Sequence, residues 1–531
     1  MLRRDLLGLA GAGLAGAGTA TVPLRVVRAQ GGNPALLWGG SMSRTLDPHT
    51  VLDAPSGLTR SNLYDMLYVY GGTPVEPRSL LVKEMRASDS GLVFDFVLHE
   101  GVRFHDGMEL TAEDVVYSFR RLLALRRGIA PAFQGVLVAD KVEATGRHSV
   151  RMRLEQPFSP LFSCLPLVAI MNRRLMEANT VNNDWGEAWI AGNDAGSGPY
   201  RVVAGSFRAL QALDMEAFPE YWRGWPHQRP IRQVICRPVA DDATRILAVE
   251  RGDIDTTTGY VRPDVHDRLR RAPGVTLTEE PQLRTFLFRM HNGRAPFNNV
   301  DYRKAISHAF PYDVFIDRML RGTAERNPGP LPLTLWGSPA GREGYRHDLD
   351  AARRHLDAAR RAGAPVDREI TFTSLVGFDE TDQAAQLLQA QLRRLGITMR
   401  ITRALWANAV QMTQSEETSP DIWAHWASTY YIDPDNWTGT FYMRAALGSQ
   451  RGSSWYRDDE TDALLHRART TLDRGERQRL YEAASRRLVD QAVDVWIYNS
   501  RAYRAVRSRI RGYQPGYTGD DVDLRNLWIE A

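Results

Sequence analysis

The chain has 531 residues, of which 43% are hydrophobic, and a formal net charge of +4. This length is enough for several domains, each with a hydrophobic core of its own. After the N-terminus no run of eighteen apolar residues occurs, so the sequence predicts no membrane-spanning helix. The low net charge argues against a surface that binds nucleic acid or another polyanion.

Residues 1–29 are interpreted as an export signal. Arg3 and Arg4 precede a weakly apolar run rich in Gly and Ala, and Ala29 ends a cleavage site of small residues. A twin arginine is typical of export in the folded state, which predicts a periplasmic location. The segment holds four Arg and one Asp, so its removal lowers the formal charge from +4 to +1.

Residues 94–123 predict a strand, a turn and a helix in quick succession. Phe94, Phe96 and Leu98 alternate with other residues in the two-residue period of a strand with one buried face. Thr111 then opens a capping box, which predicts a helix that begins immediately after it.

His105 and Asp106 lie in the turn between this strand and this helix. A metal or hydrolytic site at this pair would need a further His or carboxylate at ligand spacing on the helix that follows, and none is present. The sequence therefore favours a plain polar turn, closed by Gly107.

The two cysteines, Cys164 and Cys236, both lie among apolar residues. Neither is near the cleavage site, so the sequence predicts no lipid anchor. Two buried thiols are favoured over a disulfide, which stays open as the alternative.

Further along the chain, helices and strands alternate, which is typical of an α/β architecture. Caps and closing glycines bound several of the predicted helices. The predicted helices are 242–252, 348–363, 382–395 and 476–492, and the predicted strands are 36–38, 231–237, 284–292 and 493–498.

The segment 101–118 resembles the signature of the bacterial extracellular solute-binding proteins of family 5, the periplasmic receptors of peptide and nickel ABC importers. The family's Gly-Val-x-Phe-His-Asp-Gly and Thr-Ala-x-Asp-Val-x-x-Ser are matched at 101–107 and 111–118. Further matches lie at 46–48, 196–200 and 296–306.

The resemblance implies an α/β fold with two lobes, a periplasmic binding protein fold of type II with an extra domain and a hinge between the lobes. It implies no catalysis, cofactor or bound metal. The partners that it implies are a solute and the permease subunits of an ABC importer. The expected division is 1–29 signal peptide, 30–62, 195–283 and 494–531 first lobe, 63–194 extra domain, and 284–493 second lobe. The hinge is expected where the chain crosses, near residues 284 and 494.

In the family the loop after the Leu-Asp-Pro motif approaches the ligand, which makes Asp53 and Ser56 candidates, with an ordinary surface loop as the alternative. Asn292 matches a family Asn at the end of a strand. Trp406 and Trp426 match two pocket tryptophans, and the aromatic segment around them suits the wall of a cleft better than a core.

The family also places an Asp shortly after the second tryptophan, where it receives the α-amino group of a bound peptide. Here Thr429 or Tyr430 stands at that place, depending on the side from which one counts. Neither side chain is ionised at neutral pH, so neither offers the charge-assisted bond that a buried ammonium needs. Free-amine peptides are therefore expected to bind weakly unless Asp433, Asp435 or Asp53 substitutes.

Two alternatives stay open. A nickel or metal-chelate receptor of the same family fits the twelve His residues only weakly, because they do not cluster. A secreted enzyme is disfavoured because the sequence has no CxxC, HExxH or GxSxG motif in a suitable setting.

Removal of residues 1–29 is expected to leave a folded, soluble monomer, because no other long apolar run remains to hold the chain in a membrane. Size-exclusion chromatography of a chain that begins at Gln30 checks this. Recovery of the shortened chain only with membranes would contradict it.

Overall fold

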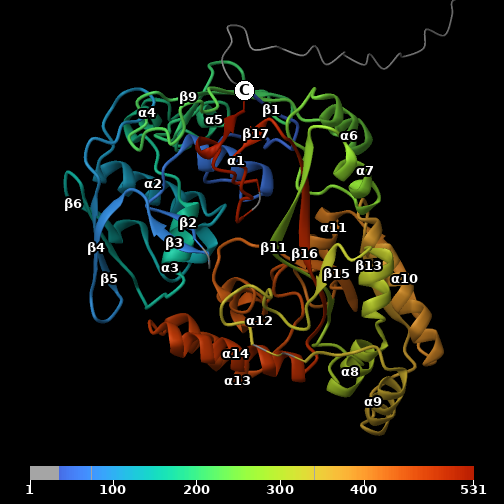
Figure 1. The fold of residues 1–531 in the computed structure, drawn as a ribbon. Coiled ribbons are helices and arrows are strands. Elements are labelled where there is room, and N and C mark those ends of the chain that lie inside the picture. Colours follow the sequence, from blue (N-terminus) through green and yellow to red (C-terminus); the bar gives the residue numbers. More distant parts are fainter. Residues whose placement is uncertain (1–34, 73–74, 340, 342, 519, 531) are drawn as a thin grey trace, which may run out of the picture.

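The computed structural model describes residues 35–72, 75–339, 341, 343–518 and 520–530. The expected export signal and its cleavage site lie outside these residues. The described part contains three sheets of four or six strands with helices packed on them, arranged around a central pair of long strands (Figure 1). Within it no helix is long and apolar enough to cross a membrane.

The first lobe, at the top of Figure 1, joins segments from both ends of the described chain. Its sheet has the order β1-β10-β9-β8, with β1 (Ala35–Trp38) parallel to β10 (Gln233–Cys236). The other strands of this sheet are β9 (Leu213–Ala217) and β8 (Tyr200–Val202). The helices of the lobe are α1 (Ala54–Leu63), α4 (Arg173–Ala178), α5 (Glu187–Ile190), α6 (Asp242–Arg251) and α7 (His266–Arg271).

A second unit, at the left of Figure 1, carries the signature segment. Its antiparallel sheet has the order β4-β5-β7-β6, from β4 (Val82–Ala87), β5 (Val93–Leu98), β7 (Ser149–Arg153) and β6 (Val142–Gly146). Phe94 and Phe96 of β5 are buried in one core with Val115 and Phe119 of α2 (Ala112–Leu125). The strand and the helix predicted for this stretch are therefore present.

The signature turn ties this unit to the first lobe. The Nδ1 of His105 lies 2.6 Å from Oδ1 of Asp194, and its Nε2 lies 3.0 Å from the carbonyl oxygen of Gly198. Asp106 accepts from the side-chain amide of Asn172 at 2.7 Å. The predicted polar turn is thus held by contacts to the segment where the chain returns to the first lobe.

The second lobe, at the lower right of Figure 1, is built on a six-stranded sheet of order β12-β16-β11-β15-β13-β14. The strands are β12 (Ala324–Arg326), β16 (Asp494–Arg507), β11 (Val275–Met290), β15 (Ile422–Ala427), β13 (Ile370–Leu375) and β14 (Met399–Ala404). Its helices of seven or more residues are α8 (Val300–Ala309), α9 (Leu349–Arg361), α10 (Asp379–Arg394), α11 (Trp406–Met412), α13 (Asp459–Thr470) and α14 (Arg474–Asp490).

Several helix ends agree with the sequence, because short-range chemistry sets them. Asp348 caps α9 by accepting from the backbone N–H groups of Asp350 and Ala351, and Gly363 follows the helix with φ +81°. α10 begins three residues earlier than predicted, at Asp379.

Two strands are much longer than the sequence predicts. β11 begins at Val275 rather than at residue 284, and β16 ends at Arg507 rather than at residue 498. Pro281 cannot donate a backbone hydrogen bond to a sheet, so it interrupts the strand pattern in the sequence. The first half of β11 is therefore not predicted as a strand. Both strands therefore run through both lobes.

The pairing of these two strands changes register at two places, between Pro281 and Thr285 and between Phe286 and Leu287, and the first is the longer interruption. Residues 275–281 of β11 pair with 501–507 of β16, and residues 285–289 pair with 494–499. Gln282, Leu283 and Arg284 lie between the two paired stretches, without a register partner on β16. A bulge of this kind weakens the ladder locally and permits bending. We propose these residues, with Ser500 opposite, as the hinge.

Cys164 and Cys236 are both buried and free. Burial raises the pKa of each thiol above its ordinary value, so both stay protonated. The interpretation as two buried thiols is confirmed over the disulfide.

Breaking the buried ion pair between Arg121 of α2 and Asp47 by removing one partner is expected to be strongly destabilising. Nη1 and Nη2 of Arg121 lie 2.9 and 2.6 Å from the two carboxylate oxygens, and both side chains are at most 1% exposed. Arg121→Met leaves a buried carboxylate unpaired, so it should lower the free energy of unfolding by about 3–5 kcal/mol in urea denaturation.

Arg147→Met is the matched control, because Arg147 pairs with Glu109 at the surface and is 68% exposed. It should change the free energy of unfolding by about 1 kcal/mol or less. Equal losses in the two variants would contradict the assignment.

Candidate functional site

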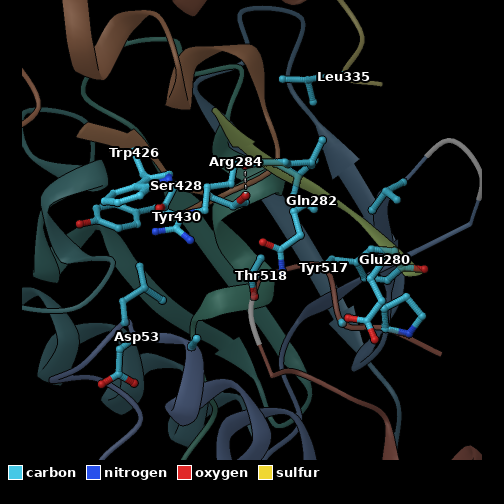
Figure 2. A pocket seen from close by; sticks show the side chains of 18 of the residues that line it. Asp53, Glu280, Gln282, Arg284, Leu335, Trp426, Ser428, Tyr430, Tyr517 and Thr518 are labelled. Carbon is cyan, nitrogen blue, oxygen red and sulfur yellow. Dashed lines mark hydrogen bonds between the residues drawn. The ribbon is translucent and has the colours of Figure 1, made fainter. Parts of the chain in front are cut away.

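A cavity of about 980 Å³ lies between the two lobes beside the central strand pair. This volume is at the upper end of the range for small-molecule sites. Its walls come from the start of α1, the turn between β2 (Tyr68–Gly71) and β3 (Glu76–Ser79), residues 280–284 of β11, β15 with the loop that follows it, and residues 515–518 (Figure 2). Both lobes and the crossing between them therefore contribute to one site, called here the inter-lobe pocket.

Aromatic side chains line one side of the inter-lobe pocket. Trp426, on β15, packs its ring 5.0 Å from Phe286 of β11 and 5.2 Å from Phe378, so its position is fixed by the core. Trp406, the first residue of α11, is 42% exposed, and Tyr430 is 38% exposed. These two rings are free to cover a ligand, which is the use that large amphipathic rings have in binding sites.

Two carboxylates also reach the inter-lobe pocket. Asp53 caps α1, and its Oδ1 accepts from the backbone N–H of Ser56 at 2.9 Å. Glu280 is buried, and its Oε1 accepts from the hydroxyls of Tyr513 at 2.8 Å and Thr278 at 3.1 Å. Figure 2 shows Asp53 and Glu280 well apart from Trp426.

Two guanidinium groups lie at the aromatic side. The guanidinium carbon of Arg284 is 4.7 Å from the centre of the Trp426 ring, and that of Arg451 is 3.7 Å from the centre of the Tyr430 ring. Nη2 of Arg451 donates to the carbonyl of Ser428 at 2.9 Å, which holds the side chain against the loop. Burial lowers the pKa of Arg451, although the group remains charged at neutral pH.

His425 lies next to these guanidinium groups and lines the inter-lobe pocket. Burial, and then the charges of Arg289, Arg451 and Arg284, hold its pKa well below the ordinary value of 6.5. Its ring is therefore neutral at periplasmic pH. Its Nε2 contacts the side-chain amide of Gln450, and its buried Nδ1 has no hydrogen-bond partner among the described residues.

The structure brings five of the eight predicted site residues to the inter-lobe pocket. They are Asp53, Trp406, Trp426, Thr429 and Tyr430. The hydroxyl of Thr429 donates to the carbonyl of Leu283 at 2.7 Å, so it is already used to hold the loop against the crossing strand.

The other three predicted residues, Ser56, Asn292 and Asp433, lie outside the lining. Ser56 completes the cap of α1 with Asp53. The amide of Asn292 donates to the carbonyls of Met290 at 2.8 Å and Val493 at 3.0 Å, which ties β11 to the start of β16. These polar groups are used within the fold.

Asp433 lies in a buried ion pair. Both of its carboxylate oxygens are 2.8 Å from Nη2 of Arg477 on α14. Asp435, two residues on, accepts from Arg469 of α13 at 2.9 and 3.0 Å. Neither carboxylate is available in place of the Asp that the family has after the second tryptophan.

Sequence reasoning missed Glu280, Arg284 and Arg451. The sequence predicts Arg284 only as the first residue of a strand and predicts no strand for Glu280. Pro281 together with charged residues on both sides marks an interruption of β11, which was the available signal for a pocket at the crossing. Among the described residues no group of three or more His, Cys, Asp or Glu side chains is placed to hold a metal ion.

Comparison with known proteins gives concordant results. The probable D,D-dipeptide-binding periplasmic protein DdpA of Escherichia coli is 29% identical over 479 residues, which cover 88% of this chain and 89% of that protein. Heme-binding protein A of Haemophilus influenzae is 25% identical over 471 residues, or 85% of this chain and 84% of that protein.

Among solved structures, the periplasmic binding protein DppA of Helicobacter pylori in complex with the peptide STSA has the same fold, with a TM-score of 0.79 at 23% identity over 94% of this chain and 98% of that one. The family model described as bacterial extracellular solute-binding proteins, family 5 Middle, matches residues 76–448. The chain therefore belongs to the bacterial extracellular solute-binding proteins of family 5.

Proposed function

We propose that this protein is the periplasmic solute-binding component of an ABC importer and that it captures a peptide-like solute in the inter-lobe pocket. The observation that carries the proposal is the cavity of about 980 Å³, lined by both lobes and by the strand that crosses between them. A ligand in that position contacts both lobes, so its binding energy favours their closure. The relatives named for dipeptides and for heme support a binding role and leave the kind of solute open.

The protein acts as a monomer that delivers its solute to permease subunits in the membrane, without catalysis and without a cofactor. Export by a twin-arginine signal remains a prediction from residues 1–29. Mass spectrometry under non-denaturing conditions, on protein purified from its native periplasm, tests the binding role. A single small solute per chain is expected, and it should be released on unfolding. Protein that never carries a solute, and that no peptide stabilises, would contradict the proposal.

Trp406→Ala is expected to weaken solute retention without unfolding the protein. The ring is 42% exposed and lines the inter-lobe pocket, so its loss removes contact with the ligand but little core packing. The same experiment on the purified variant, with its melting temperature, checks both parts.

Trp423→Ala is the matched control, because Trp423 lies three residues before Trp426 on the same strand and is 1% exposed. Truncation of this core residue should cost about 3–5 kcal/mol of stability. Unchanged retention in Trp406→Ala together with a loss of stability equal to that of the control would assign Trp406 to the core, and unchanged retention alone would remove it from the binding site.

An N-acetylated peptide is expected to bind at least as tightly as the same peptide with a free amine. The loop after Trp426 offers Thr429 and Tyr430 instead of a carboxylate, and a buried ammonium without a partner loses about 3–5 kcal/mol, or several hundredfold and more in affinity. Titration calorimetry with Ala-Ala and N-acetyl-Ala-Ala measures the difference.

A clear preference for the free amine would overturn this expectation and would assign the amine to Asp53 or Glu280, the two carboxylates of the inter-lobe pocket. Asp53→Asn and Glu280→Gln would then show which of them is the anchor.

A further inference from the structure

The aromatic side of the inter-lobe pocket holds two positive charges, Arg284 and Arg451, that form no ion pair with a carboxylate of the described residues. Nη1 of Arg284 is 3.5 Å from the hydroxyl of Tyr260, and its buried Nε has no hydrogen-bond partner there. Arg451 donates only to neutral oxygens, at 2.8 Å to the carbonyl of Asn436 and at 2.8 Å to the hydroxyl of Thr440. Both side chains are partly buried. A partly buried guanidinium without a carboxylate loses hydration, so a group that neutralises it recovers part of that free energy.

The neighbouring ionisable groups do not remove this positive charge. Arg289 is paired with Asp494 at 3.2 Å, so that pair is neutral. His425 is uncharged, as described above. Burial raises the pKa of Glu380 and the charge of Arg284 lowers it, and its Oε2 accepts from the hydroxyl of Tyr498 at 3.3 Å. Even when ionised, Glu380 supplies one negative charge against the two guanidinium groups. The net charge at the aromatic side of the inter-lobe pocket is therefore positive.

The opposite side is negative. Glu280 and Asp520 share one guanidinium, that of Arg504, whose Nε is 3.6 Å from Oε1 of Glu280. Glu280 and Arg284 are four residues apart on β11, which is roughly 13 Å of extended chain. In Figure 2 Glu280 lies with Tyr517, whereas Arg284 and Ser428 lie toward Trp426 and Tyr430. The inter-lobe pocket is thus polarised along the crossing strand.

We infer that the solute carries an anionic group, a carboxylate by class, that binds at Arg284 and Arg451 next to the Trp426 and Tyr430 rings. The inference rests on the proposed function and specifies its ligand. Nη1 and Nη2 of Arg451 already donate within the fold, so Arg451 contributes mainly its charge. Arg284 offers the planar fork that matches the two oxygens of a carboxylate, and charge-assisted bonds to it are stronger than neutral ones. The subsite stands where a peptide's ammonium was expected, so an ammonium is disfavoured there and an acid is favoured.

A matched pair of probes tests the charge of the subsite. N-acetyl-Ala-Ala carries one carboxylate, and its C-terminal amide has nearly the same shape without the charge. Titration calorimetry at neutral pH and low salt should give a dissociation constant at least tenfold lower for the acid than for the amide. In Arg284→Gln the two constants should come within about twofold of each other.

Arg444→Gln is the control, because Arg444 is 56% exposed and pairs with Asp459 at 2.6 Å on the outside of the second lobe. It should retain the full preference for the acid. Arg451→Gln tests the second guanidinium of the subsite in the same way. Melting temperatures confirm that each variant is folded before the dissociation constants of the acid and the amide are compared.

The inference would be overturned if the amide bound as tightly as the acid or more tightly, or if the acid did not bind below about 1 mM. It would also be overturned if the preference for the acid survived Arg284→Gln. The solute released from the native protein separates this failure from failure of the proposed function. A released solute that is neutral or purely cationic leaves the importer role intact and removes the anionic subsite. A released solute with a carboxylate, lost from Arg284→Gln and kept by Arg444→Gln, supports both.

Discussion

The antiparallel pairing of β11 with β16 carries both lobes of this protein. Each strand contributes to the core of the first lobe at one end and to the core of the second lobe at the other, so the lobes share a continuous backbone connection. The longer of the two interruptions of the ladder falls at residues 282–284, and those residues line the inter-lobe pocket. A ligand in the inter-lobe pocket therefore contacts the proposed hinge. Glu280 precedes this interruption and Arg284 is its last residue, so a change of angle at the proposed hinge changes the spacing of the two charges.

The charged side chains that hold the loop after Trp426 and those on the aromatic side of the inter-lobe pocket have different partners. Asp433 and Asp435 are each paired with a guanidinium from α14 or α13, which fixes the loop after Trp426 against the helices behind it. Leaving such pairs incomplete would be strongly destabilising, so their geometry is closed to a ligand. Arg284 and Arg451, by contrast, use neutral oxygens and aromatic faces for support. This contrast distinguishes residues that hold the site from residues that are available to a solute.

Much of the fold could be predicted from the sequence because it depends on neighbours along the chain. The cap at Asp348, the closing Gly363 and the strand around Phe96 follow from spacings of a few residues, and the structure has all three. The site was only partly predictable, because it depends on long-range pairing. Asp433 and a ligand-binding Asp cannot be told apart in sequence, since the distinction is made by Arg477, forty-four residues away. The inward position of Glu280 likewise depends on how β11 pairs beyond Pro281.

The unpaired guanidiniums also connect ligand charge to lobe closure. When the lobes close, water leaves the inter-lobe pocket and the effective dielectric constant falls, so an uncompensated Arg284 becomes more costly. An anionic solute removes that cost, and it does so more in the closed form than in the open form, where water still screens the charge. A ligand shifts such an equilibrium only by its difference in affinity for the two forms. With these charges at the proposed hinge, the inferred anionic solute favours the closed form of the loaded protein, while the empty protein favours the open form. A permease needs to distinguish these two forms.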